Sequence, residues 1–325
     1  MKEKTSSHLQ SVLLSAIDRG DDSSRMTYCP DLEGLKVSME ARGLFNPVIL
    51  RGKEDFQVVA GYRRILVATS LGWKTIPARV FTPEDLDIEE SFRLNFYENL
   101  GTREFNLVEA AMVVSGFLDK CKMDSTQVRE KILPLLGFQS GAAVLGELHS
   151  LLRLIDPWKE LVVRDEIALP NAAKIAAFPS LEQKILFEAL SGLKLGHNKM
   201  RHCMEMIAEI CRRDEIPVVQ LFAAKPFREL TQNEKRNTTA KTEMFRRELR
   251  KIRYPQLTRC EEEFQDARRK LSLPPSISME PPEFFEGEKV KVTFSFRTPE
   301  ELRTILKKLQ EAASSEALHD MLGRI

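Results

Sequence analysis

The sequence has few cysteines, and their arrangement excludes two common kinds of site. The number is odd, the spacing is wide, and no Cys-x-x-Cys pair occurs. This pattern fits neither a disulfide framework nor a zinc site, so we expect reduced thiols in a cytoplasmic protein. The cysteines are Cys29, Cys121, Cys203, Cys211 and Cys260.

Long apolar runs are also missing. No stretch approaches the roughly 20 apolar residues of a membrane span, and the N-terminus has no apolar run of signal-peptide length. Aromatic residues make up only 7% of the 325 residues, and the net charge is +1. We therefore expect no membrane partner, small helical domains rather than a β-sandwich, and no strong charge on the chain as a whole.

The spacing of apolar residues predicts an α+β protein with several segments and no internal repeat. Helical periodicity dominates from Asn106 to Arg213, whereas short β-branched runs precede it and two proline-containing stretches follow it. The predicted segments are a flexible leader (1–30), a small α+β domain (31–105), a helical domain (106–213), a linker with a basic helix (214–272), and a C-terminal β-α module (273–325).

Strands and helices alternate in the small domain, and a single strand and helix end the chain. The predicted hairpin is the run Asn46–Leu50 with Phe56–Ala60, followed by helix Tyr62–Leu71, strand Thr75–Phe81 and helix Asp85–Asn99. In the C-terminal module, Lys289–Phe296 alternates as a half-buried strand, and Thr298 with Pro299 predicts the start of a helix. One strand needs a partner, either from another segment or from a second protomer, and we favour dimerisation.

Gly61 joins a predicted strand to a predicted helix, and two arginines follow in the helix's first turn. The first amide N–H groups of a helix and its dipole favour an anion at this end. Arg63 and Arg64 are basic residues where the dipole disfavours them, a cost that a bound phosphate would offset. The alternative is that both arginines are solvated or pair with nearby acids.

A carboxylate and a carboxamide stand side by side at the end of the next predicted helix. Glu98 and Asn99 offer the hard oxygen ligands that a nucleotide-borne magnesium ion prefers. The alternative is a helix terminus in which Asn99 merely acts as a cap.

These pieces, in this order and spacing, resemble the N-terminal domain of the ParB/RepB-type partition protein family. The matching boxes are Gly43-Leu44-Phe45-Asn46-Pro47, Gly61-Tyr62-Arg63-Arg64 and Glu98-Asn99-Leu100. The resemblance covers roughly residues 30–210, and the C-terminal region is not part of it. It implies a ParB/sulfiredoxin-like fold that binds CTP with Mg²⁺. Carried over, Gly61, Tyr62, Arg63, Arg64 and Arg103 would hold the nucleotide, Glu98 and Asn99 the metal, and Glu98 would serve catalysis.

Two departures from the family pattern leave hydrolysis open. Tyr62 stands where the family commonly has glutamate, and Arg103 is displaced by one residue from its usual place. Nucleotide binding is thus indicated more directly than slow CTP hydrolysis. Sulfiredoxin chemistry is excluded because no cysteine lies between Cys29 and Cys121, whereas a small-molecule kinase on this fold stays an alternative.

The resemblance places a helix-turn-helix in the helical domain, with helices at 127–136 and 140–154. The second helix carries no Arg or Lys from Ser140 to Ser150 and contains Gly141 and Gly146. A recognition helix usually presents basic or amide side chains to DNA. We therefore predict a degenerate helix-turn-helix without sequence-specific contacts in the major groove.

A basic stretch follows the first linker. From Lys225 to Arg259 there are eleven basic residues and four acids, a net charge of +7. Such a stretch is typical of contact with phosphate backbones, although a solvated helix is the alternative. The candidate DNA-binding residues are Arg246, Arg247, Arg250, Lys251 and Arg253.

Together these observations predict a nucleotide-switched, DNA-associated protein. The resemblance implies a clamp in DNA segregation or in nucleoid or mobile-element maintenance, a homodimer, a ParA-like ATPase partner and association with the nucleoid. A non-enzymatic adaptor or transcription regulator that keeps the fold but not the switch is the main alternative.

Overall fold

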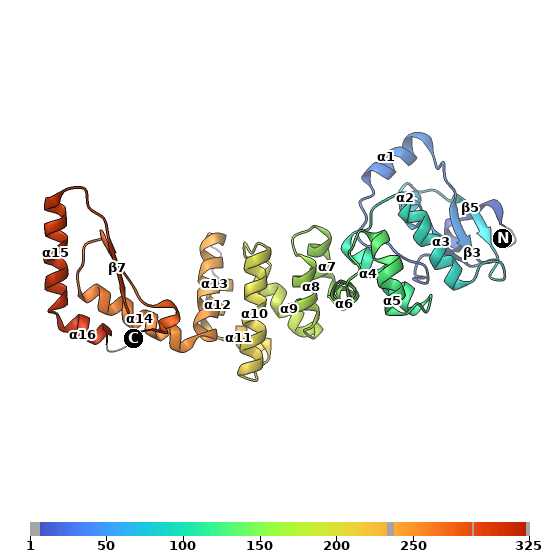
Figure 1. Ribbon diagram of the computed structural model, residues 1–325. Coiled ribbons are helices and arrows are strands. Elements are labelled where there is room, and N and C mark those ends of the chain that lie inside the picture. Colours follow the sequence, from blue (N-terminus) through green and yellow to red (C-terminus); the bar gives the residue numbers. More distant parts are fainter. Residues whose placement is uncertain (1–6, 233–236, 288, 323–325) are drawn as a thin grey trace. The chain divides into compact units, whose positions relative to one another are not determined.

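The structure is a computed structural model that describes residues 7–232, 237–287 and 289–322. The chain divides into two compact units, residues 1–204 and 205–325 (Figure 1). The fold class is α+β, as predicted, because one mixed sheet is followed by a long series of helices.

A five-stranded mixed sheet forms the core of the first unit, with strand order β1-β5-β3-β4-β2. Pairs β1–β5 and β3–β4 are antiparallel, whereas β3–β5 and β2–β4 are parallel. The strands are β1 (His8–Leu13), β2 (Ile17–Asp18), β3 (Val48–Arg51), β4 (Phe56–Ala60) and β5 (Thr75–Phe81). The predicted hairpin and the third predicted strand are therefore confirmed.

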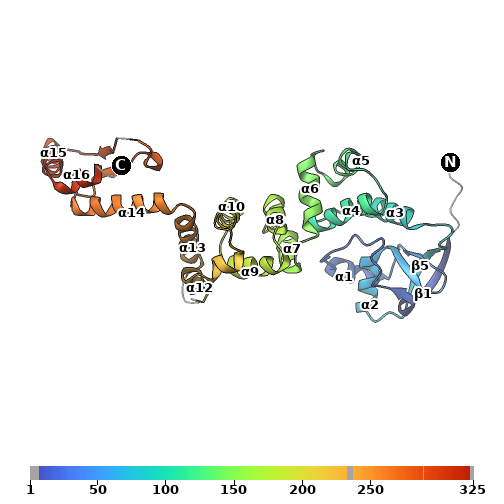
Figure 2. The ribbon, with the colours of Figure 1, turned by 90° about the horizontal axis from the view of Figure 1, so that it is seen from below.

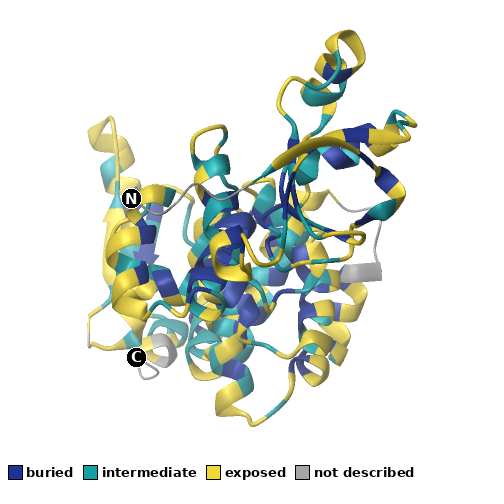
Figure 3. Ribbon diagram, turned by 90° about the vertical axis from the view of Figure 1, so that its right-hand side faces the viewer, coloured by how far each residue is buried: buried dark blue, intermediate teal, exposed yellow. Residues whose placement is uncertain are grey.

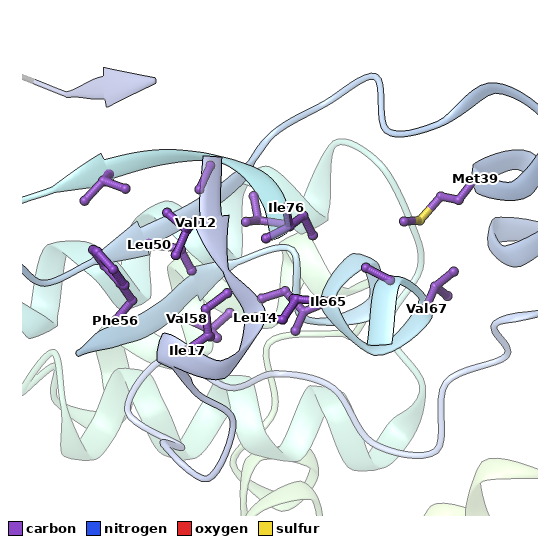
Figure 4. Close-up of a cluster of buried hydrophobic side chains, with 14 residues drawn as sticks. Val12, Leu14, Ile17, Met39, Leu50, Phe56, Val58, Ile65, Val67 and Ile76 are labelled. Atoms are coloured by element: carbon purple, nitrogen blue, oxygen red, sulfur yellow. The ribbon is translucent and has the colours of Figure 1, made fainter. Parts of the chain in front are cut away.

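Two helices cover opposite faces of this sheet, as Figure 2 shows for α2 (Tyr62–Ser70) and α3 (Ile88–Leu100). Side chains alternate between the faces because a strand has a period of two residues. Leu50 and Val58 join the cluster that includes Ile65 of α2 (Figure 4), whereas Val59 packs on the other face with Leu94 of α3.

The assignment of residues 1–30 to a flexible leader was wrong for the part that the structure describes. Residues 8–18 supply both edge strands of the sheet, joined by the 3-10 turn Leu14–Ala16. Val12 and Ile17 are buried in the same cluster as Leu50 (Figure 4). These strands escaped prediction because their partners lie about 40 to 70 residues away, and β1 buries a single side chain. Residues 1–6 lie outside the described residues.

Helix α1 (Glu33–Arg42) precedes β3 and packs against α2. Only Met39 of this helix is buried, and Figure 3 shows how exposed its other residues are compared with the sheet. Val37 of this helix is 63% exposed, and Phe45, which follows the helix, is 74% exposed.

Helices make up the rest of the first unit. A π-helical turn (η2, Val128–Ile132) stands before Pro134, and its last bond runs from Leu133 N to Val128 O at 3.0 Å. Proline has no N–H and disturbs the preceding turn, which explains the irregular helix there. The helices are α4 (Leu107–Asp119), α5 (Ser125–Gln127), η3 (Pro134–Leu136), α6 (Ala142–Leu151), α7 (Asp156–Val163), α8 (Leu169–Ala176) and α9 (Ser180–Leu190). Helix α10 (His197–Arg213) begins in this unit and ends in the second. The two helices predicted at 127–136 and 140–154 correspond to η2 with η3 and to α6.

In the second unit, part of the predicted linker is helical. Residues 218–232 form α11 (Val218–Ala223) and α12 (Lys225–Gln232). Phe222 and Phe227 pack with Phe245 of α13 (Thr238–Arg253), with ring centroids 5.2 to 5.8 Å apart. This aromatic cluster buries the segment, and α14 (Pro255–Lys270) follows it.

The C-terminal module finds its second strand within the chain. Residues between the two proline pairs form β6 (Ile277–Glu280), which pairs antiparallel with β7 (Lys291–Phe294). Helices α15 (Pro299–Ala313) and α16 (Glu316–Leu322) follow, with the short η4 (Glu283–Phe285) between the strands. Thr298 caps α15 as predicted, through its side chain and the amide of Glu301. The expected burial of β7 was wrong, since Val292 is 39% exposed.

Candidate functional site

A cleft of about 310 Å³ lies in the first unit, and every residue predicted to hold a nucleotide or metal lines it. These residues come from the start of α2, the end of α3 and the loop after α3. They are Gly61, Tyr62, Arg63, Arg64, Glu98, Asn99 and Arg103, and Thr27, Asp31, Leu35, Asn46, Asn95 and Thr102 complete the lining.

Gly61 makes the sharp connection from β4 into α2. Its φ is 96°, in the left-handed region that favours glycine. A Cβ atom there would lie 2.9 Å from Val48 Cγ1 and 3.0 Å from the guanidinium of Arg64. The first amide groups of α2 point out of the helix without intrahelical acceptors, so the backbone at this end is suited to an anion.

Arg64 is held against Glu98. Its Nη2 donates to Glu98 Oε1 at 2.6 Å, and its Nη1 donates to the carbonyl oxygens of Asn46 and Pro47 at 3.0 and 3.1 Å. Both side chains are partly buried, with 15% and 30% exposure. The interaction ties the first turn of α2 to the last turn of α3.

Arg63 and Arg103 share one buried carboxylate, that of Glu109 at the start of α4. The distances are 3.1 Å from Arg63 Nη2 to Oε1 and 2.5 Å from Arg103 Nη1 to Oε2. The Glu109 side chain is only 1% exposed. Burial lowers the pKa of Arg103, and the facing carboxylate of Glu109 opposes that shift. Two guanidinium groups on one carboxylate leave a net positive charge beside the cleft.

The side chain of Asn99 bonds to α3 and to the loop after it, so it does not stand open to a ligand. Its Oδ1 accepts from Arg103 Nε at 2.6 Å, and its Nδ2 donates to Asn95 Oδ1 at 2.6 Å. Asn99 could ligate a metal only after the bond from Arg103 opened. Within the described residues, no group of three or more His, Cys, Asp or Glu side chains could hold a metal ion.

The sequence-based alternative, that the arginines pair with nearby acids, is therefore what the structure shows. Glu98 was named as a candidate, but Glu109 was not. The signal that could have found it is Asn106-x-x-Glu109, a capping box at a helix start, which the structure contains. Nothing in that pattern reveals that Glu109 also pairs with two distant arginines.

The five candidate DNA-binding residues lie on α13 in the second unit, and each contacts an acid. Arg250 makes two bonds of 2.7 Å to Glu261. The other partners are Glu243 for Arg246, Glu248 for Arg247, Glu262 for Lys251 and Glu209 for Arg253. Helix α13 still has six basic residues against two acids. Arg247 is the most exposed of the five, at 61%, and Arg253 the least, at 28%.

In the predicted recognition helix α6, the exposed positions include Ala142, Ala143, Gly146 and His149. No Arg or Lys occurs between Ala142 and Ser150. Among the helices that the structure describes, none is long and apolar enough to cross a membrane.

Residues 1–100 match the family profile of the ParB N-terminal domain. Over these residues the chain is similar to ParB N-terminal domains. The match includes the two edge strands and the cleft residues up to the end of α3.

Curated relatives extend the similarity beyond the ParB N-terminal domain. The chromosome-partitioning protein ParB of Caulobacter vibrioides (strain NA1000 / CB15N) is 29% identical over 169 residues, or 50% of this chain and 53% of that protein. A nucleoid occlusion protein of Bacillus cereus (strain AH187) is 24% identical over 181 residues, or 55% and 59%. The chain thus spans about half the length of the curated relatives it matches.

Solved structures similar to the chain include two of a C-terminally truncated ParB from Caulobacter crescentus. One is complexed with CTP-gamma-S, with 25% identity and a TM-score of 0.26 over 55% of this chain and 99% of that chain. The other is complexed to the centromeric parS site, with 25% identity and a TM-score of 0.32 over 57% and 94%.

Proposed function

We propose that the cleft binds a nucleoside triphosphate, CTP, together with Mg²⁺. The observation that carries this proposal is the gathering of Arg63, Arg64 and Arg103 at the amino end of α2. Arg63 Nε is buried and has no acceptor among the described residues. A buried donor without a partner costs stability, so an oxygen of a bound phosphate fits this position. The choice of cytosine rests on the family resemblance.

Each group of the cleft would have a separate part in holding the triphosphate. The first amides of α2 and the guanidinium of Arg63 would donate to phosphate oxygens. Arg64 would exchange its bond to Glu98 for one to phosphate, which would release the Glu98 carboxylate. Magnesium is commonly bound by one or two carboxylates and by the phosphates themselves, and Glu98 would supply the carboxylate here.

At the level of the whole protein, we propose a nucleotide-switched, DNA-associated clamp in DNA segregation or nucleoid maintenance. The relatives are named for chromosome partitioning and nucleoid occlusion. The clamp would be a homodimer through the C-terminal module, would associate with the nucleoid, and would act with a ParA-like ATPase. Contact with DNA would be made by α13 to the phosphate backbone, because α6 carries no Arg or Lys.

Calorimetry with a poorly hydrolysed CTP analogue, magnesium and a DNA duplex tests the first proposal. We expect binding by the unmodified protein and at least about tenfold weaker binding by Arg64→Ala, because one charge-assisted contact would be lost. Arg79→Ala is the matched control, since Arg79 is exposed on β5 and does not line the cleft. An unmodified protein that binds no nucleotide under these conditions would refute the proposal.

One observation favours a second candidate, a non-enzymatic adaptor or regulator. Arg63, Arg64 and Arg103 each make an ion pair with Glu98 or Glu109 in the absence of any ligand. Replacing both Arg63 and Arg64 with alanine separates the two candidates in cells. Plasmid or chromosome maintenance would survive in an adaptor whose fold is intact and fail in a nucleotide switch.

A further inference from the structure

Residues 22–28, here named the strap, run beside the cleft and are held by side chains from α3, from the loop after α3, and from the two ends of α4. Ser24, Met26 and Thr27 of the strap are buried. The side chains of Asn95 and Arg103 donate to Ser24 O at 2.5 Å and to Met26 O at 2.9 Å. Asn106, at the start of α4, donates to Tyr28 O at 3.1 Å. Lys120, at the end of α4, donates to Asp22 O and Ser23 O at 2.8 and 2.7 Å. The strap is thus held chiefly through its backbone carbonyl groups.

Glu109 receives donors from both the cleft and the strap. Its Oε1 accepts from Arg63 Nη2 at 3.1 Å and from the amide of Tyr28 at 3.2 Å. Its Oε2 accepts from Arg103 Nη1 at 2.5 Å and from the amide of Asn106 at 3.3 Å. Four donors converge on one carboxylate that is not among the residues lining the cleft.

We infer that Glu109 is a positioning residue of the nucleotide cleft, which holds Arg63, Arg103 and the strap as one unit. The inference rests on the proposed function. A carboxylate that is buried beside two guanidinium groups restricts where those groups can lie, because each alternative leaves a buried charge unpaired. Arg103 also donates to Met26 of the strap, so the two arginines and the strap are positioned together.

Two roles for Glu109 predict opposite changes in affinity. If the carboxylate positions the arginines, Glu109→Gln frees them, and the nucleotide must order them on binding. If the carboxylate only neutralises them, the same change makes the cleft more positive, and an anionic ligand binds more tightly. A purely structural role would lower thermal stability and leave affinity unchanged.

Calorimetry on the full chain, with the CTP analogue and magnesium as the probe, decides between these roles. We expect Glu109→Gln to bind about tenfold more weakly, and Glu109→Asp, which keeps the charge on a shorter side chain, to fall between it and the unmodified protein. Glu104→Gln is the matched control, because it makes the same chemical change on an exposed residue of the neighbouring loop. Equal or tighter binding by Glu109→Gln would overturn the inference.

Hydrogen exchange without any ligand tests the strap independently. We expect the amides of residues 22–28 to exchange about tenfold faster in Glu109→Gln than in the unmodified protein, with the Glu104→Gln control unchanged. Unchanged protection of the strap would overturn the inference. Should Glu109→Gln fail to fold, Glu109→Asp gives the same comparison. An unmodified protein that binds no nucleotide refutes the proposed function alone, and the exchange result then decides the positioning role.

Discussion

The phenol of Tyr28 donates a hydrogen bond to Asp156 Oδ1 at 3.2 Å. Tyr28 is the last residue of the strap, and Asp156 is the first residue of α7. The contact therefore joins the segment beside the cleft to the helix that follows the predicted helix-turn-helix. Burial and the neighbouring Asp156 carboxylate raise the pKa of Tyr28, so the phenol remains a donor at neutral pH.

Tyr28→Phe should lower the free energy of unfolding by about 0.5–1 kcal/mol at neutral pH, because one hydrogen bond is lost. The raised pKa of Tyr28 means that the folded state holds the proton more tightly than the unfolded state. Its contribution is therefore complete below about pH 10 and declines as the pH rises above that value. Urea denaturation at several pH values should show the two proteins converging in alkaline solution. Tyr254→Phe in the other unit is the control.

Gly61→Ala should destabilise the protein more than Gly72→Ala. Both glycines have positive φ, 96° and 73°, but only at Gly61 would a Cβ atom collide with neighbouring side chains. We expect a loss of about 1 kcal/mol for Gly72→Ala from the backbone conformation alone. For Gly61→Ala we expect about 2–4 kcal/mol, together with weaker nucleotide binding. Equal losses in urea denaturation would contradict the close packing of Val48 and Arg64 on Gly61.

Two helical glycines should respond to alanine with opposite signs. A Cβ atom on Gly116 of α4 would lie 1.9 Å from Phe92 Cζ, whereas nothing lies within 4 Å of one on Gly146 of α6. Gly116→Ala should cost about 3 kcal/mol or more. Gly146→Ala should stabilise the protein by about 0.5–1 kcal/mol, because alanine is the better helix former. Thermal or urea denaturation measures both, and a loss of stability for Gly146→Ala would be the contrary result.

If α13 binds DNA through phosphates, Arg247→Ala should flatten the salt dependence of the affinity. Each phosphate contact that is lost should change the slope of log K against log salt by about 0.9. Arg253→Ala should act more on stability, because Arg253 is less exposed and pairs with Glu209. Fluorescence anisotropy over a salt series provides the slope, and an unchanged slope for Arg247→Ala would argue against contact at that residue.

The local parts of the fold could be predicted from the sequence, and the nonlocal parts could not. Strand Thr75–Phe81 has the predicted bounds, and α2 begins at Tyr62 as the glycine before it indicated. By contrast, β1 depends on a partner strand more than 60 residues away, and β6 is a four-residue strand between prolines. Short strands with few buried side chains carry little periodic signal, since their pairing decides their structure.

The same distinction holds for the candidate site. The resemblance brought Gly61, Arg63, Arg64, Glu98, Asn99 and Arg103 together in advance, and the structure places them around one cleft. It could not show that Glu98 and Asn99 are already engaged with arginines. The role of Glu109 in the site could not be predicted, because a capping residue has the same sequence pattern whether or not it also pairs with distant charges.

The two edge strands, β1 and β2, both come from the eleven residues 8–18. The sheet therefore cannot be completed during synthesis until β5, which pairs with β1, has emerged. Such long-range pairing favours slow folding. A variant that lacks residues 1–18 would lose both β1 and β2, so β5 and β4 would become the edges of the sheet. Exposed strand edges promote association between chains. Deletion of this short segment would thus cause aggregation before it caused a loss of ligand binding.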